Sequence, residues 1–110
     1  MFNVLTGHRD DHLRNHGFVR STDGWRLAPA FDLNPMPDSA EHELAIGLDT
    51  HAPDLELAVA QTAPFCRLSA AASRRFVEEV RGAVVGWREV AAEASLSADE
   101  IELMDSTIAP

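Results

Sequence analysis

Two acids and one amide in the first third of the chain have the residue types that phosphoryl transfer needs. Asp10 and Asn15 lie five positions apart in a polar run, and a second acid, Asp32, follows later. In this chemistry the protein mainly positions the reactants and stabilises negative charge, and one carboxylate must orient the attacking hydroxyl and accept its proton. Oxygen ligands must also hold Mg²⁺ against the phosphates. Asp10 suits the first role, and Asn15 and Asp32 suit the second.

The residues between Asn15 and Asp32 predict a β-hairpin. Strands are expected at about 17–21 and 25–28, and Asp23-Gly24 between them is a strong turn signal. A hairpin returns the chain to its starting point and would bring the two ends of the segment together, as the chemistry requires. The run His8–Asn15 also has the H-R-D-x-x-x-x-N spacing of protein kinase catalytic loops, which is a modest signal by itself.

The order of loop, hairpin and an acid after an aromatic residue closely resembles the C-terminal region of HipA-like serine/threonine kinases, the toxins of bacterial toxin–antitoxin pairs. The run FNVLTGHRDDHLRNHGFVRSTDGWRLAPAFDLNP, residues 2–35, carries the resemblance, which is looser over 36–110. It implies that Asp10 is the catalytic base and that Asn15 and Asp32 are the Mg²⁺ ligands. His12 and Arg14 also fall on family motif positions, which implies a place near the phosphates or the substrate.

The chain departs from the family pattern at three single positions, and it lacks sequence features that bind ATP in such kinases. His8 stands where the family usually has Asn, Arg14 where it often has Lys, and Phe31 where it usually has Tyr. The chain has no glycine-rich phosphate loop and no Lys at all. We therefore expect a C-terminal portion of such a kinase that lacks the ATP-cradling lobe and is inactive alone. The resemblance implies ATP and Mg²⁺ as cofactors, and we expect neither to bind this chain tightly.

The remaining pattern predicts an α+β, mostly helical chain: the C-terminal part of a protein-kinase-like C-lobe, with one β-hairpin followed by a helical bundle. We expect a single incomplete domain, with the catalytic-loop, hairpin and metal-binding segment at 1–35 and a helical remainder at 36–110. Residues 1–6 read as a helix end that stops at Gly7, and 29–42 as a loop.

Periodicity and capping residues place the later helices. An extended piece is expected at 43–46, a short helix at 53–62, and one long amphipathic helix over 69–94 with Ser69 as its N-cap. Ser97 followed by Glu100 forms a capping box for a last helix over about 98–108.

The composition limits the classes of partner and the cellular location that we expect for this chain. The net charge of −9 argues against nucleic acid or an anionic membrane as the main partner. No apolar run approaches the ~18 residues of a membrane span, the start lacks the pattern of a signal peptide, and the lone Cys66 allows no internal disulfide, so we expect a cytoplasmic protein. Cys66 itself is expected to be a half-buried apolar residue.

Three alternatives stay open. The histidines at 8, 12 and 16 could suggest zinc, but they lie in a predicted loop without a fourth ligand, so we favour structural or exposed roles. Trp25 and Trp87 are expected to be core anchors rather than ligand-stacking residues. The chain could also be a non-catalytic binding module, because the uncapped apolar start suggests a surface that a missing N-terminal kinase region, a separately encoded piece, an antitoxin or a second copy would cover.

Overall fold

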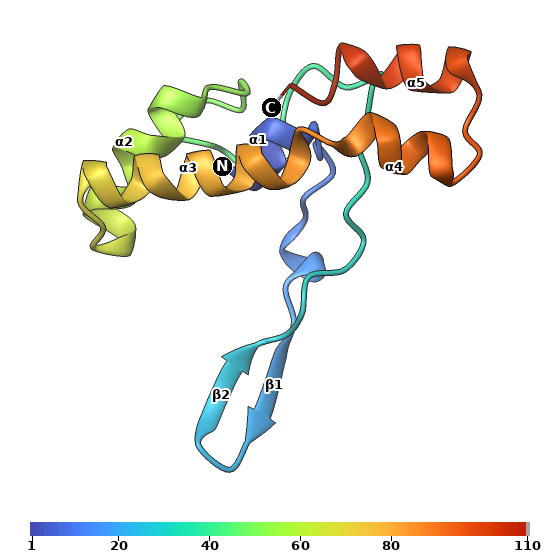
Figure 1. The fold of residues 1–110 in the computed structure, drawn as a ribbon. Helices are drawn as coiled ribbons and strands as arrows, with labels where there is room; N and C mark the ends of the chain where they lie inside the picture. Colours follow the sequence, from blue (N-terminus) through green and yellow to red (C-terminus); the bar gives the residue numbers. More distant parts are fainter. Residues whose placement is uncertain (110) are drawn as a thin grey trace.

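A computed structural model describes residues 1–109. It confirms the α+β, mostly helical class, with one antiparallel hairpin followed by helices (Figure 1). The elements, in chain order, are α1 (Phe2–Thr6), the 3₁₀ turn η1 (Leu13–Asn15), β1 (Phe18–Ser21), β2 (Gly24–Leu27), α2 (Leu55–Cys66), α3 (Ala70–Val84), α4 (Trp87–Glu93) and α5 (Ala98–Asp105). Across the described range, no helix is both long and apolar enough to cross a membrane.

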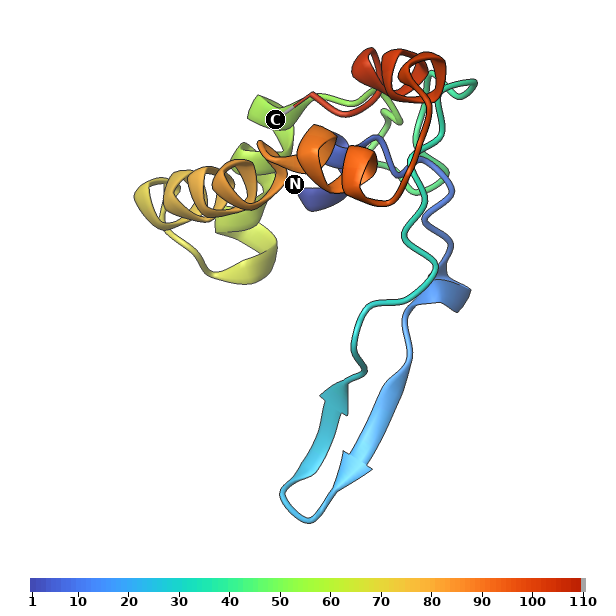
Figure 2. The same ribbon diagram turned by 45° about the vertical axis from the view of Figure 1, so that its right-hand side comes forward.

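The hairpin forms where the turn residues predict it. Phe18 pairs with Leu27, and Ser21 pairs with Gly24, whose φ of 117° is accessible to glycine. Figures 1 and 2 show the hairpin projecting away from the helices. The prediction that Trp25 is a core anchor is therefore wrong: its side chain is 70% exposed, because the strand that carries it extends beyond the packed helices.

A small apolar core holds the first helix in place. Leu5 of α1, Val59 of α2 and Val77 of α3 form the buried cluster, and Val80 packs against it. Burying these side chains favours the packed state by about 25 cal/mol for each Å² of apolar surface removed from water. Since α1 ends at the residue before Gly7, this core fixes the point where the predicted catalytic loop begins.

The predicted long helix over 69–94 is wrong in one respect, because the structure divides it. Ser69 caps α3 as predicted, by accepting a hydrogen bond from the Ala72 amide. α3 then ends at Val84, and α4 begins only at Trp87, after Gly86. Glycine loses more backbone entropy in a helix than other residues, so a break there costs little. The apolar period continues across the break, which is why the sequence pattern does not reveal it.

The neighbouring helix α5 begins where its capping residues predict, whereas the length predicted for α2 is wrong. Ser97 and Glu100 form the predicted capping box of α5, which packs on α4 through an Arg88–Asp105 ion pair. α2 begins after the cap of Asp54 and continues past the predicted end at residue 62 to Cys66. Cys66 is exposed rather than half-buried, because it lies in the last turn of that helix.

The end of the described chain returns to α1. The Ala109 amide donates a hydrogen bond to the Leu5 carbonyl oxygen at 3.0 Å, and Ile108 is buried. Thr107 packs directly on Gly7, which has a φ of +68° and ends α1. Figure 1 shows the segment after α5 returning to α1. The start of the catalytic loop therefore lies between the core and the C-terminal segment.

Gly7→Ala is expected to destabilise the chain strongly. A Cβ at this position would overlap the Thr107 side chain and lie 2.7 Å from the Thr107 carbonyl oxygen. The left-handed backbone alone costs a residue with a Cβ about 1–2 kcal/mol, and the overlap adds to that. Thermal unfolding followed by circular dichroism measures the loss. The matched control is Gly82→Ala in α3, where the added Cβ meets no atom within 4 Å and helix propensity predicts a gain of about 1 kcal/mol. A Gly7→Ala melting temperature equal to that of the wild type would contradict the packing described.

Candidate functional site

A buried histidine ties the catalytic loop to the segment that follows the hairpin. The His8 side chain is 2% exposed. Its Nδ1 lies 3.1 Å from the Asn34 carbonyl oxygen and 3.3 Å from the Asn34 amide nitrogen, and it can pair with one of them in either neutral tautomer. This contact joins residues on the two sides of the hairpin, so the hairpin's base is closed by a side chain as well as by its own strands.

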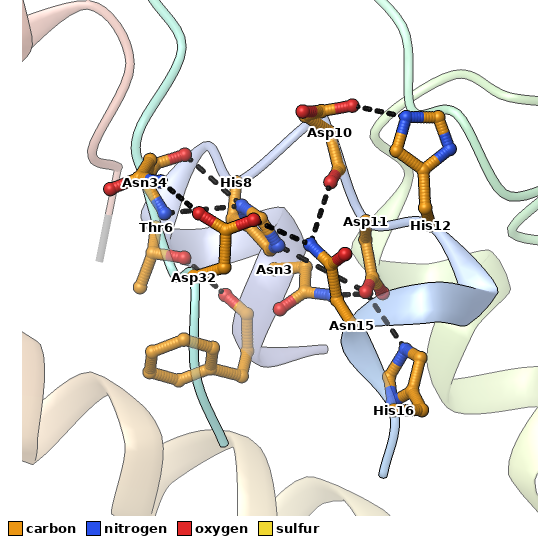
Figure 3. Close-up of polar contacts among 11 residues, drawn as sticks. Asn3, Thr6, His8, Asp10, Asp11, His12, Asn15, His16, Asp32 and Asn34 are labelled. Carbon is orange, nitrogen blue, oxygen red and sulfur yellow. Dashed lines mark hydrogen bonds and ion pairs between the residues drawn. The ribbon is translucent and has the colours of Figure 1, made fainter.

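Asn15 is the residue that brings the predicted site together. Its Nδ2 donates to the Asp10 carbonyl oxygen and to Asp32 Oδ2, each at 3.3 Å (Figure 3). Asn34 Nδ2 donates to the other Asp32 oxygen at 2.8 Å. Asp32 has a φ of 57°, a left-handed conformation that Asp tolerates better than most residues. Both carboxylate oxygens of Asp32 are therefore held by amide donors beside Asn15.

The carboxylate of Asp10 points to a different partner. Its Oδ1 lies 2.6 Å from His12 Nε2, and the other ring nitrogen of His12 lies 3.7 Å from Glu43 Oε1. Figure 3 shows the Asp10–His12 contact on the side of the loop away from Asp32. The backbone of Asp10 is thus linked to Asn15, which also contacts Asp32, while the Asp10 side chain contacts His12.

Arg14 is the predicted residue that stands apart from the others. It is exposed in the short turn η1. Within residues 1–109 its side chain makes no hydrogen bond or ion pair with Asp10, His12, Asn15 or Asp32. The placement near phosphate or substrate that the resemblance implies for Arg14 stays a prediction.

The neighbouring acid Asp11 has a structural role that sequence reasoning missed. Its carboxylate is 15% exposed, accepts from Asn3 Nδ2 and lies 2.8 Å from His16 Nε2, with His8 Nε2 at 3.9 Å. Asp11 therefore links α1, the buried histidine and the start of the hairpin. The four-residue spacing of His8, His12 and His16 was the one sequence signal for a structural cluster here. That spacing does not show that Asp11 is the acid that contacts two of these histidines. No group of three or more His, Cys, Asp and Glu side chains suited to a metal ion occurs among residues 1–109.

Two cavities flank the site. A mostly polar cavity of about 500 Å³ is lined by Asp10, Glu43 and His51, among others. A mostly apolar cavity of about 440 Å³ is lined by Asn15 together with Leu27 and several aromatic residues. The predicted base and the predicted metal ligand Asn15 therefore border cavities of opposite character.

The loop over residues 42–51 clamps onto the catalytic loop. The Glu43 amide donates to the Arg9 carbonyl oxygen, and the His42 amide donates to the His51 carbonyl oxygen, both at 2.8 Å. His51 Nδ1 donates in return to the His42 carbonyl oxygen. The extended piece predicted at 43–46 does not form a strand, since the backbone hydrogen bonds of this loop go to its own ends and to Arg9 rather than to a neighbouring strand.

Arg9 and His42 form a buried polar pair inside this clamp. Arg9 Nη1 donates to His42 Nε2 at 2.7 Å, and the His42 side chain is 4% exposed. Burial, and then the nearby guanidinium of Arg9, lower the pKa of His42 from 6.5 to about 4. The pair therefore requires a neutral imidazole.

Protonation of His42 is expected to destabilise the chain at acid pH. Between pH 6.5 and 4 the unfolded chain binds a proton at this residue and the folded chain does not, so stability falls as pH falls through this window. At about 1.36 kcal/mol for each pH unit, a pKa lowered from 6.5 to about 4 corresponds to about 3 kcal/mol of stability. Urea unfolding at steps from pH 7 to pH 4 measures the slope. His42→Gln, which cannot titrate, should flatten it, and equal slopes for the variant and the wild type would contradict the assignment.

Comparison with known proteins identifies the family. No curated protein and no solved structure matches the chain. The HipA-like C-terminal domain family matches residues 1–88, which include the catalytic loop, the hairpin, α2 and α3. The match includes residues 2–35, which carry the resemblance to HipA-like kinases, and continues into the helices. The chain therefore belongs to the family of HipA-like C-terminal domains.

Proposed function

We propose that this chain supplies the catalytic base and two metal ligands of a HipA-like, ATP-dependent protein serine/threonine kinase. The observation that carries the proposal is the Asn15 amide, which lies 3.3 Å from both the Asp10 carbonyl oxygen and Asp32 Oδ2. It links the backbone of Asp10 to the carboxylate of Asp32 from the two sides of the hairpin, while the Asp10 carboxylate lies beside it at His12. Membership of the HipA-like family supports the same assignment.

Asp10 acts as the base in this proposal. The attacking serine or threonine hydroxyl gives its proton to a carboxylate oxygen of Asp10 as its own oxygen bonds to the γ-phosphorus. The bond from that phosphorus to the β-phosphate oxygen breaks, and the electron pair leaves with ADP. Asp10 lines the polar cavity of about 500 Å³, which gives a hydroxyl-bearing segment a route to it.

The donor set fits Mg²⁺. Asn15 and Asp32 supply an amide oxygen and a carboxylate, the hard oxygen donors that Mg²⁺ prefers, and their side chains are neighbours, since Asn15 Nδ2 donates to Asp32 Oδ2 at 3.3 Å. To act as a ligand, the Asn15 amide would turn over so that its oxygen, rather than its nitrogen, faces Asp32. The ligand atom of Asn15 would be Oδ1, because the amide nitrogen has no available lone pair. Two protein ligands are few, but Mg²⁺ usually keeps waters and takes phosphate oxygens as well. When bound, the ion would offset negative charge on the phosphates.

Mn²⁺ binding tests the metal site. Because Mn²⁺ broadens nearby NMR signals, titration into ¹⁵N-labelled chain should broaden the backbone amides around Asn15 and Asp32 first. Asp32→Asn removes the one ligand charge and should weaken binding at least about tenfold. Asp49→Asn, which changes an exposed acid elsewhere, is the matched control and should leave binding unchanged. The proposed ligands would be contradicted if Asp32→Asn left the Mn²⁺-induced broadening unchanged. They would also be contradicted if the most strongly broadened amides were not those around Asn15 and Asp32.

The groups that hold ATP must come from outside these 110 residues. The chain has no Lys and no glycine-rich phosphate loop. Phe18, Trp25 and Leu27 expose 66%, 70% and 59% of their surface on the hairpin that joins Asn15 to Asp32. We propose this hairpin as the docking surface for the polypeptide that completes the ATP site, so that the chain is a binding module until that polypeptide is present.

The chain alone is expected to show no phosphotransfer. A base and two metal ligands lower no barrier while the γ-phosphate is not held in line with the attacking hydroxyl. Release of ADP and transfer of ³²P to a serine-containing protein should both equal those of the Asp10→Ala variant. Turnover by the 110-residue chain that Asp10→Ala abolishes would overturn both the inactivity and the need for a second polypeptide.

A further inference from the structure

We propose that His12 and Glu43 are positioning residues for the catalytic base: Glu43 holds the His12 ring, and His12 orients the Asp10 carboxylate. The inference rests on the proposed function of Asp10, and it assigns the 42–51 loop a role in the site. It also gives His12 a contact with the base itself, in addition to the place near phosphate or substrate that the resemblance implies.

The first step is the contact between His12 and Asp10. His12 Nε2 and Asp10 Oδ1 are 2.6 Å apart. A ring nitrogen and a carboxylate oxygen attract at this distance only when the nitrogen carries the proton, because two lone pairs would repel. Nε2 therefore holds a proton directed at Oδ1. One oxygen of Asp10 is engaged in this way, and the other stays available to the attacking hydroxyl.

The second step is the position of the His12 ring. The His12 amide donates to the Asp10 carbonyl oxygen at 3.2 Å, and its carbonyl oxygen accepts from the Asn15 amide at 2.9 Å. On its other side the ring faces the exposed Glu43 carboxylate, whose Oε1 lies 3.7 Å from Nδ1, too far for a hydrogen bond, so Glu43 acts on the ring through its charge. Turning the ring over would move both nitrogens away from their acids. The backbone and the two carboxylates thus favour one ring orientation.

The third step is the anchoring of Glu43. Its backbone amide is bonded to the carbonyl oxygen of Arg9, the residue before Asp10, and the Arg9 side chain is bonded to His42, the residue before Glu43. Arg9 makes both contacts, one through its backbone and one through its side chain, so they tie the 42–51 loop to the residue that precedes the base. The Glu43 side chain therefore starts from a point fixed relative to Asp10.

The fourth step is the shared cavity. Asp10 and Glu43 both line the polar cavity of about 500 Å³, together with Ser39 and His51. His12 contacts Asp10, which lines this cavity, so the orientation in which it holds the carboxylate sets how the free carboxylate oxygen faces a hydroxyl in the cavity. If the Asp10 side chain exchanged among several rotamers, its carboxylate would be oriented to accept the hydroxyl proton in only a fraction of the molecules.

The rotamer of Asp10 in the full chain tests the proposal without any need for turnover. Three-bond couplings from the Asp10 Cγ to its backbone nitrogen and carbonyl carbon report χ1. We expect one staggered rotamer in the wild type and a mixture of the three wells in His12→Ala. His12→Gln keeps an amide donor and should restore the single rotamer in part. Glu43→Gln, which keeps the size of the side chain and removes its charge, should shift the couplings towards averaging.

His16→Ala is the matched control, since His16 belongs to the same run but contacts Asp11. It should leave the Asp10 couplings unchanged. Averaged couplings in the wild type, or unchanged couplings in both His12→Ala and Glu43→Gln, would overturn the proposal. Mn²⁺ broadening at Asn15 and Asp32 should persist in His12→Ala, because neither His12 nor Asp10 is a proposed ligand. Failure of Mn²⁺ binding in the wild type would therefore count against the proposed function, and the Asp10 rotamers would still decide the role of His12.

Discussion

The candidate site depends on one bridging side chain, the Asn15 amide, which contacts the backbone of Asp10 and the carboxylate of Asp32. That bridge can form only if the chain leaves Asn15, travels along two strands and returns to within hydrogen-bonding distance. The antiparallel hairpin provides the return, and the buried contact of His8 with Asn34 closes it. The hairpin tip is exposed and makes no part of this closure, so the geometry of the site is set at the hairpin's base.

The base of the hairpin is supported in turn by residues distant in the sequence. The core of Leu5, Val59 and Val77 holds α1, and Gly7 directs the chain from α1 into the catalytic loop. Thr107 covers Gly7, and the Ala109 amide pairs with the carbonyl oxygen of Leu5. These C-terminal residues lie beyond the part of the chain that the family match covers. The candidate site is therefore supported partly by residues that the family match does not include.

Local chemistry made some of this predictable. The hairpin follows from its turn residues, and the start of α3 and of α5 follows from Ser69 and Ser97, because each of these signals acts over a few residues. The types and spacing of Asp10, Asn15 and Asp32 predicted a phosphotransfer site, and the Asn15 amide contacts both the Asp10 backbone and the Asp32 carboxylate. The ring contact of His12 with Asp10 was missed, since the resemblance placed that histidine near phosphate or substrate instead.

Features set by long-range contacts were not predictable in the same way. The break after Val84 leaves the apolar period intact, so periodicity suggests one helix where there are two. Trp25 has the composition of a core residue, but the hairpin extends beyond the helices that could have buried it. The clamp of the 42–51 loop joins His42 to Arg9 across more than thirty positions, and no local pattern identifies such a pair. Sequence reasoning therefore identified the candidate site residues but not the long-range contacts that surround them.

The central claim is that Asn15 and Asp32 form one metal-binding position beside Asp10. Crystals of the 110-residue chain soaked in Mn²⁺ test it most directly, because the anomalous signal locates the ion independently of any assignment. The account predicts a peak bonded to Asn15 Oδ1 and Asp32 Oδ2, at about 2.1–2.2 Å from each, on the order of the Mg²⁺ bond length. A peak in the polar cavity between Asp10 and Glu43, or no peak at this position at saturating Mn²⁺, would contradict it.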